Sequence, residues 1–182
     1  MKIILNRYYD KSKCTEDIIG DFGFISFTKE FTYLGSIVSY DYDYADVTSR
    51  IKKASQAMGA LIFFWDSNHV DIGAKVLIYL AIPVNLLLWG CQSWALTKVL
   101  IKKLEVFHTR CIRRILQIKW DDVREFRIKN SQVRERFKNI DTIENIISKR
   151  RLIFIGKVIR MPCKCVPARL ISAFQTKKET SR

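Results

Sequence analysis

Histidine is scarce in this sequence, and the cysteines do not form the pairs that a structural zinc site requires. The only histidines are His69 and His108, and neither lies at ligand spacing from Cys163 and Cys165. Because no second cysteine pair exists, we expect no bound metal and no cofactor. The five cysteines are odd in number and no signal-peptide pattern precedes them. Their pattern predicts free thiols in a reducing, intracellular compartment.

A long uninterrupted apolar run is also missing. The most apolar stretch, residues 76–91, is shorter than the roughly 20 residues that a bilayer-spanning helix requires. It contains Pro83 and Asn85, and Lys75 directly precedes it. We therefore expect a soluble chain in which this stretch is a helix buried on all sides, with a bend near Pro83 where one backbone donor is absent.

Acidic residues are few in the second half of the chain. Residues 1–90 hold 9 Lys and Arg against 10 Asp and Glu, whereas residues 91–182 hold 23 against 8. The net charge of +14 therefore comes from the second half, in a chain that is 48% hydrophobic and long enough to fold. Charge of this size on folded sequence predicts a polyanionic partner, either nucleic acid or an anionic membrane surface.

The segment Y-D-Y-D-Y-A-D-V at residues 40–47 has two interpretations. Its three aspartates, Asp41, Asp43 and Asp46, resemble a cation loop or the acidic turn of a two-metal polymerase. The helix predicted over residues 45–65 offers a simpler explanation, because apolar residues recur there at steps of three and four. Asp43 or Asp46 would then be an N-cap or first-turn acid that accepts bonds from free amides.

The remaining pattern predicts a mainly α-helical bundle with a small N-terminal β-hairpin. Residues 22–39 are rich in aromatic and β-branched residues and predict the hairpin, with its turn at 28–30. Capping residues and apolar periodicity predict further helices, with Asp71, Thr97 and Asp141 as N-caps. These helices cover residues 71–89, 98–118, 130–137, 141–160 and 166–174. The segment that begins at Trp120, Asp121 and Asp122 is predicted to be a polar connection. Residues 1–21 give no clear signal, and 175–182 form a loose tail.

The helix at 98–118 has the clearest pattern in the chain, with an apolar stripe and a basic stripe on opposite sides. The apolar stripe consists of Leu100, Leu104, Phe107, Cys111, Ile115 and Ile118. The basic stripe consists of Lys102, Lys103, Arg110, Arg113 and Arg114. Charge on an amphipathic helix is usually a solvated outer face, but this stripe carries no acid of its own. We therefore predict that the stripe binds nucleic acid, together with the triplet Lys149, Arg150 and Arg151.

Five motifs occur in an order and at spacings that resemble the C-terminal part of non-LTR (LINE-like) retrotransposon reverse transcriptases. The similarity covers most of residues 27–174. The motifs are F-T-Y-L-G-S at 31–36, Asp46 with Arg50, Ile51 and Ala54, L-L-W-G-C-Q-S-W at 87–94, K-L-E-V-F-H-T-R-C-I-R-R-I-L at 103–116, and R-R-L followed by G-K-V-I-R-M-P at 150–162.

The resemblance implies a particular piece of the polymerase. Residues 22–40, with Tyr33, Leu34 and Gly35, resemble the hairpin after the palm near the primer grip. Residues 41–120 resemble the thumb, and 121–174 resemble a helical extension. The catalytic carboxylates of the family lie upstream of the hairpin, and Val47 stands where a second carboxylate would be required. The resemblance therefore implies no catalytic residue in this chain, as in a truncated or degenerate copy that is inactive alone.

Together these observations predict a palm-less reverse-transcriptase fragment that binds a template–primer duplex through basic helical faces. The resemblance implies RNA–DNA or DNA duplex and a palm-containing chain as partners, and a location in the nucleus. Two alternatives are a peripheral protein of anionic membranes, which uses the same basic faces, and an inert folded remnant that binds nothing.

Overall fold

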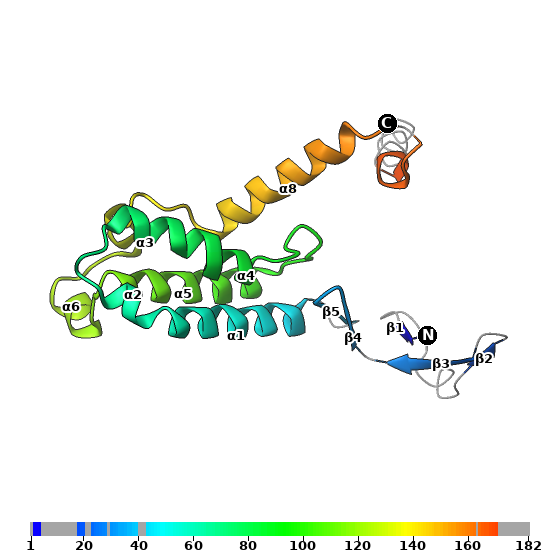
Figure 1. Ribbon diagram of the computed structural model, residues 1–182, viewed down its shortest axis with the longest axis horizontal. Helices are drawn as coiled ribbons and strands as arrows, with labels where there is room; N and C mark the ends of the chain where they lie inside the picture. The colour runs from blue at the N-terminus through cyan, green and yellow to red at the C-terminus, as the bar shows by residue number, and fades with distance from the viewer. Residues whose placement is uncertain are drawn as a thin grey trace.

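The protein is mainly α-helical with a small N-terminal β-hairpin, which confirms the predicted fold class (Figure 1). The computed structural model describes residues 2–4, 18–20, 23–28, 30–39, 43–162 and 164–170. Its elements, in order, are β1 Lys2–Ile4, β2 Ile18–Gly20, β3 Gly23–Thr28, β4 Glu30–Tyr33, β5 Ser36–Ser39, α1 Tyr44–Ala60, α2 Ile62–Asp66, α3 Ile72–Tyr79, the π-helix η2 Leu80–Val84, α4 Asn85–Leu87, α5 Lys98–Ile115, α6 Trp120–Glu125, α7 Asn130–Arg136 and α8 Ile143–Ile159.

The hairpin consists of β4 and β5, and its turn is not where the sequence pattern placed it. The strands pair in antiparallel register from Glu30 opposite Ser39 to Tyr33 opposite Ser36. Leu34 and Gly35 form the turn with φ of 47° and 80°. Two positive φ values in a two-residue turn match the twist of antiparallel strands, and glycine adopts such a φ without strain. The predicted turn at 28–30 is wrong, because β3 pairs instead with β1 and β2.

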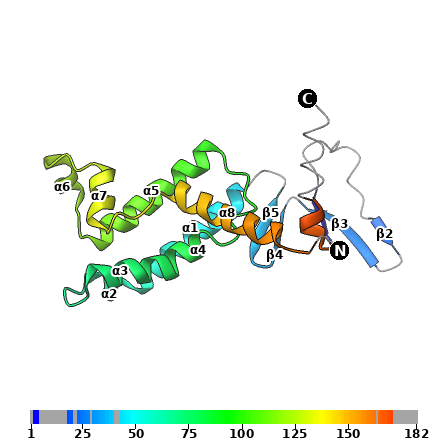
Figure 2. The ribbon, with the colours of Figure 1, turned by 90° about the horizontal axis from the view of Figure 1, so that it is seen from above.

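The helical bundle is built around α1 and α5. α1 lies against η2, α4 and α5, while α5 also contacts α7 and α8 (Figures 1 and 2). The predicted helix at 45–65 is present but is interrupted at Leu61, where α1 ends and α2 begins. The apolar side chains gather between these helices, and the core includes Val47, Trp65 and Leu104, none of which is exposed.

The apolar stretch at 72–87 forms three consecutive helical segments. Asp71 caps α3 by accepting a bond from the Gly73 amide at 2.6 Å, as expected. Pro83 lies in the π-helical segment η2, whose wider spacing accommodates a residue without an N–H. The stretch as a whole is not buried on all sides as predicted, since Leu77 of α3 is 69% exposed. Apolar composition does not reveal how many neighbours a helix has, and this one lies at the edge of the bundle.

A buried polar chain joins α3, α5 and the start of α8. The Tyr79 hydroxyl and the Nδ1 of His108 are 2.8 Å apart, and Nε2 lies 3.2 Å from the Asp141 carbonyl oxygen. With its proton on Nε2, the imidazole donates to that carbonyl and accepts from the tyrosine. Burial lowers the pKa of His108 from 6.5 to about 4, although the carbonyl bond opposes this effect. His108 is therefore neutral in the folded protein at neutral pH.

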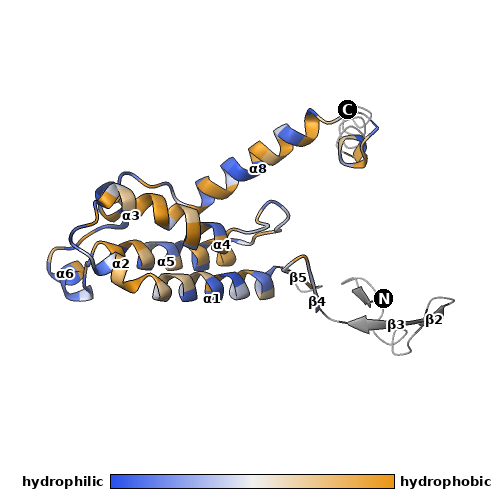
Figure 3. Ribbon diagram, in the orientation of Figure 1, coloured by the Kyte–Doolittle hydropathy of each residue, from blue (hydrophilic) through white to orange (hydrophobic). Residues whose placement is uncertain are grey.

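The C-terminal helix α8 is anchored at its start and extends away from the bundle (Figure 1). Thr142 is the N-cap, one residue later than the predicted Asp141, and accepts from Asn145 N at 3.3 Å. Glu105 on α5 accepts from Ile143 N at 2.8 Å, which fixes α8 to α5. Beyond this anchor α8 exposes five large apolar residues, namely Leu152, Ile153, Phe154, Ile155 and Ile159. Much of this part of the helix is coloured as hydrophobic in Figure 3.

The predictions for the C-terminal region differ in their outcomes. The short helix at 130–137 is confirmed as α7, whereas α6 was not predicted, because Trp120, Asp121 and Asp122 suggested only a polar connection. Residues 166–170 are helical, as expected. Residues 171–182, with the predicted loose tail, lie outside the described part of the chain.

Candidate nucleic-acid interface

The basic stripe of α5 faces outward because the opposite side of the helix is buried. Thr97 caps α5 by accepting from Leu100 N at 3.4 Å, as predicted. The apolar stripe is confirmed: five of its members are buried and Ile118, just beyond the helix, is half-buried. The buried members are Leu100, Leu104, Phe107, Cys111 and Ile115. Burial of that side leaves the five basic residues on the outer flank.

The cations of the stripe differ in exposure, and Lys103 is held against α1. Lys102, Arg110 and Arg114 are exposed, whereas Lys103 and Arg113 are half-buried. The Nζ of Lys103 donates to Thr48 Oγ1 at 3.0 Å and lies 4.3 Å from the centre of the Tyr44 ring. The cations of α5 and the exposed side of α1 therefore share one surface.

Arg113 and Arg114 mark the C-terminal end of the stripe. The Nη2 of Arg113 donates to Asn130 Oδ1 at 2.7 Å, and its guanidinium lies 5.0 Å from the Trp120 ring centre. Arg114 pairs with Asp66 of α2 at 2.9 Å. No acid of α5 lies within the stripe, but in the folded protein Asp66 of α2 lies beside it. Both partners are about half exposed, so the pair contributes little and leaves Arg114 accessible.

The triplet at 149–151 lies elsewhere, at the base of α8. Lys149 is exposed and pairs with Asp141 at 2.5 Å. Arg150 donates to the Leu88 carbonyl at 3.2 Å and to Asn85 Oδ1, and Arg151 donates to the Trp94 carbonyl at 2.5 Å. These two arginines satisfy backbone carbonyls after α4 and fix α8 to that loop. The structure therefore does not bring the triplet together with the α5 stripe in one contact network.

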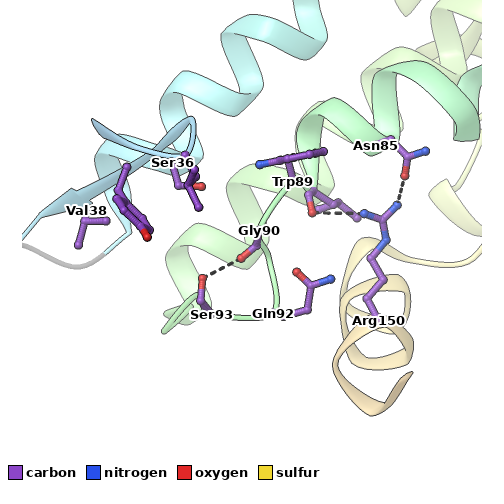
Figure 4. Close-up of a pocket in the computed structure, with 11 residues that line it drawn as sticks. Ser36, Val38, Asn85, Trp89, Gly90, Gln92, Ser93 and Arg150 are labelled. Carbon is purple, nitrogen blue, oxygen red and sulfur yellow. Dashed lines mark hydrogen bonds between the residues drawn. The ribbon is translucent and has the colours of Figure 1, made fainter. Parts of the chain in front are cut away.

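Tyr33 and Leu34 line a cleft of about 780 Å³ between the hairpin, the 88–93 loop and α8 (Figure 4), whereas Gly35, in the hairpin turn, is not part of its lining. Tyr33 and Leu34 are exposed, and Trp89 from the loop is exposed beside them. The figure shows Arg150 reaching from α8 toward Asn85 on the far side of the cleft. The hairpin thus presents apolar side chains to a cleft that Arg150 lines on the opposite side.

Asp46 fixes the hairpin to the bundle. Its Oδ1 accepts from Ile37 N at 3.0 Å, and its Oδ2 accepts from the Trp94 indole at 2.9 Å. Arg50, one turn later, forms an ion pair with Asp46 at 3.4 Å and donates to the Gly35 carbonyl at 2.6 Å. Both carboxylate oxygens of Asp46 therefore contact protein groups, which come from the hairpin, from α1 and from the loop that contains Trp94.

The predicted capping role of the acids near α1 is only partly correct. Asp43 occupies the N-cap position and Asp46 lies in the first turn, but Asp43 makes no side-chain bond to the helix amides. Its carboxylate accepts instead from Ala95 N. Burial raises the pKa of Asp43, an effect that the Ala95 amide opposes and the nearby Asp46 carboxylate adds to. Asp41 lies outside the described residues.

The part of the chain that the structure describes contains no cluster of three or more His, Cys, Asp or Glu residues able to hold a metal ion. Cys91 and Cys111 are both buried free thiols. Burial raises the pKa of Cys111 to about 12, so this thiol stays protonated at neutral pH. Of the Cys163 and Cys165 pair, only Cys165 is described.

Comparisons with protein-family models, with curated proteins and with solved structures find no match to this chain. Within the described ranges, no helix combines the length and the apolar character needed to cross a bilayer.

The structure adds residues that sequence reasoning did not select. Trp120 is 65% exposed and, with Lys119, lines a small cleft beside the end of the basic stripe. Trp89 is similarly exposed, at 57%, beside the hairpin. The available signal was a tryptophan placed directly after a basic helix, in the sequence Ile118-Lys119-Trp120, although its packing could not be read from the chain alone.

Proposed function

We propose that this protein binds the backbone of a nucleic-acid duplex through the basic stripe of α5. The observation that carries the proposal is the set of five cations on one outward flank, with Lys102 and Arg110 exposed. The apolar side of the same helix is buried, so the flank is fixed in orientation by the core. A row of cations held in one orientation matches the row of phosphate charges along a duplex strand.

The binding is electrostatic and independent of base sequence. Lys103 and Arg114 are eleven positions apart, which is roughly 16 Å along a helix axis. That length spans a few successive phosphates of a duplex strand. Lysine and arginine on phosphates release condensed counterions and position the duplex, whereas they do not read base edges. The expected property is therefore strong salt dependence with little sequence preference.

In this proposal the chain is the thumb-like piece of a non-LTR reverse transcriptase, as the motif order suggests. It holds the template–primer duplex while the metal-binding carboxylates are supplied by a palm in another polypeptide. The role of Asp46 supports this division of labour, because that carboxylate is engaged by Ile37, Trp94 and Arg50 rather than open to a cation.

The test is the salt dependence of duplex binding in a double variant, Lys102→Gln with Arg110→Gln. Binding of an RNA–DNA hybrid to the wild type should weaken steeply as salt rises. The double variant should bind more weakly, and its log–log slope should be flatter by about 1 for each phosphate that it no longer neutralises. Both side chains are exposed, so the fold should persist.

Lys157→Gln provides a control for the loss of a single charge, because Lys157 is an exposed cation on α8, outside the stripe. It changes the net charge while leaving α5 intact. If the double variant keeps the wild-type affinity and slope in a folded protein, the stripe is only a solvated surface and the proposal is wrong.

One observation favours a second candidate, peripheral binding to anionic membranes. α8 exposes Leu152, Ile153 and Phe154 between the cations Lys149 and Lys157. Apolar side chains with flanking cations suit the headgroup region of an anionic bilayer. Co-sedimentation with vesicles that contain phosphatidylserine, compared with neutral vesicles, separates this function from duplex binding. An inert remnant would bind neither.

A further inference from the structure

The end of the basic stripe leads into a small cleft between α5 and α6. The cleft has a volume of about 200 Å³. Its lining divides into four cations and three apolar side chains, and no carboxylate is among them. The residues are Arg110, Arg113, Arg114, Lys119, Ile118, Trp120 and Val123. Pockets for drug-sized ligands measure roughly 300–1,000 Å³, so this one has room for a group about as large as one nucleobase.

Trp120 is held as a platform in this cleft. Its indole is 65% exposed, which is unusual for the largest apolar side chain. The Arg113 guanidinium lies 5.0 Å from the ring centre, and Asn130 Oδ1 fixes that guanidinium at 2.7 Å. A cation over one face of an indole orders both side chains, and the residue as a whole still remains 65% exposed.

The acids near the cleft are already engaged or directed elsewhere. Asp66 pairs with Arg114, and the Asp122 carboxylate accepts from Lys119 N at 2.8 Å. Asp121 is exposed on α6 and does not line the cleft. The lining therefore combines an exposed aromatic face with unopposed Arg110 and Lys119, the two features that recognise an unpaired nucleotide.

We infer that this cleft binds an unpaired nucleotide, with its base stacked on Trp120 and its phosphate beside Arg110 and Lys119. The inference rests on the proposed duplex binding, because Arg110, Arg113 and Arg114 belong to both surfaces. A strand that leaves the duplex at this end of α5 would enter the cleft directly. Stacking tolerates any base, so the site recognises a single-stranded extension rather than a sequence.

The experiment compares two RNA–DNA hybrids that differ only in a single-stranded overhang of a few nucleotides. Wild type should bind the overhang hybrid at least about fivefold more tightly than the blunt hybrid, as stacking of one base on an aromatic side chain predicts. Trp120→Ala should lose this gain, measured against the same variant's affinity for the blunt hybrid, since the change also removes the ring that Arg113 contacts. Trp120→Phe should retain part of the gain, since the phenyl ring can still stack.

Trp89→Ala is the matched control. Trp89 is a tryptophan of similar exposure, 57%, in a different cleft near the hairpin. It should leave the overhang gain unchanged. A 2-aminopurine placed in the overhang adds a direct reading, because its fluorescence should be quenched by wild type and by Trp89→Ala but not by Trp120→Ala.

The possible failures are distinguishable. If the blunt hybrid binds with the expected salt slope but the overhang adds nothing, or adds as much in Trp120→Ala, the cleft does not hold an unpaired nucleotide and duplex binding stands. If wild type binds neither hybrid, the proposed function fails and the inference fails with it.

Discussion

The carboxylate of Asp46 and the indole of Trp94, 48 residues apart in the sequence, are joined by a hydrogen bond of 2.9 Å. The same carboxylate holds the hairpin through Ile37 N and pairs with Arg50. Three segments distant in sequence therefore meet at one buried acid. This bond explains an aspartate that the sequence pattern alone associated with either metal binding or helix capping.

We expect Asp46→Asn to destabilise the protein by about 3–5 kcal/mol, because it leaves the buried Arg50 guanidinium without its ion-pair partner. Urea denaturation followed by circular dichroism measures the effect. Glu125→Gln, at an exposed position of α6, should change the free energy of unfolding by no more than about 0.5 kcal/mol. Equal destabilisation in both variants would contradict the clamp role of Asp46.

The free energy of unfolding should decrease as the pH falls from about 6.5 to 4. His108 has a pKa of about 4 in the folded protein and 6.5 as its ordinary value, so within this range the unfolded chain binds a proton that the native state does not. The stability contributed by neutral His108 is complete above pH 6.5 and lost as pH falls to 4, a decrease of about 3 kcal/mol. Denaturant melts across this pH range measure it.

Two variants test the origin of that pH dependence. His108→Gln should be less stable at pH 7, since it disturbs the buried bonds to Tyr79 and Asp141, and its stability should vary less between pH 6.5 and 4. His69→Gln, at an exposed histidine, should keep the wild-type pH profile. An unchanged profile in His108→Gln would show that other groups cause the dependence.

Truncation of the buried side of α5 should have a large effect and truncation of its outer side a small one. Leu104 is fully buried, so Leu104→Ala should cost about 2–5 kcal/mol. Val106, two positions further on, is 61% exposed, and Val106→Ala should cost less than about 1 kcal/mol. Thermal melts of the two variants decide whether the apolar stripe is the buried side in solution.

The isolated chain should not extend a primer with magnesium or manganese, because Asp46 is committed to protein groups and Val47 follows it. A primer-extension assay with labelled nucleotides tests this directly. Template-dependent incorporation by the purified wild type that disappears in a folded Asp46→Asn variant would show that the carboxylate takes part in catalysis.

Local sequence signals located most of the helices. Thr97 and Asp71 cap helices where their residue types indicate, since capping depends on the residues within one turn of the helix end. The two stripes of α5 were likewise readable, because a period of 3.6 residues fixes which side chains share a face. The candidate interface was therefore predictable as a set of residues on one helix.

Tertiary structure decided what no local pattern contains. The sequence did not show that Arg150 and Arg151 fix α8 to the loop after α4, that Asp66 pairs with Arg114, or that Trp120 lies beside Arg113. Each of these interactions joins separate segments and depends on how the helices cross. Charge and periodicity in the sequence determined a helical chain with a basic flank, whereas packing in three dimensions determined which cations remain open to a ligand.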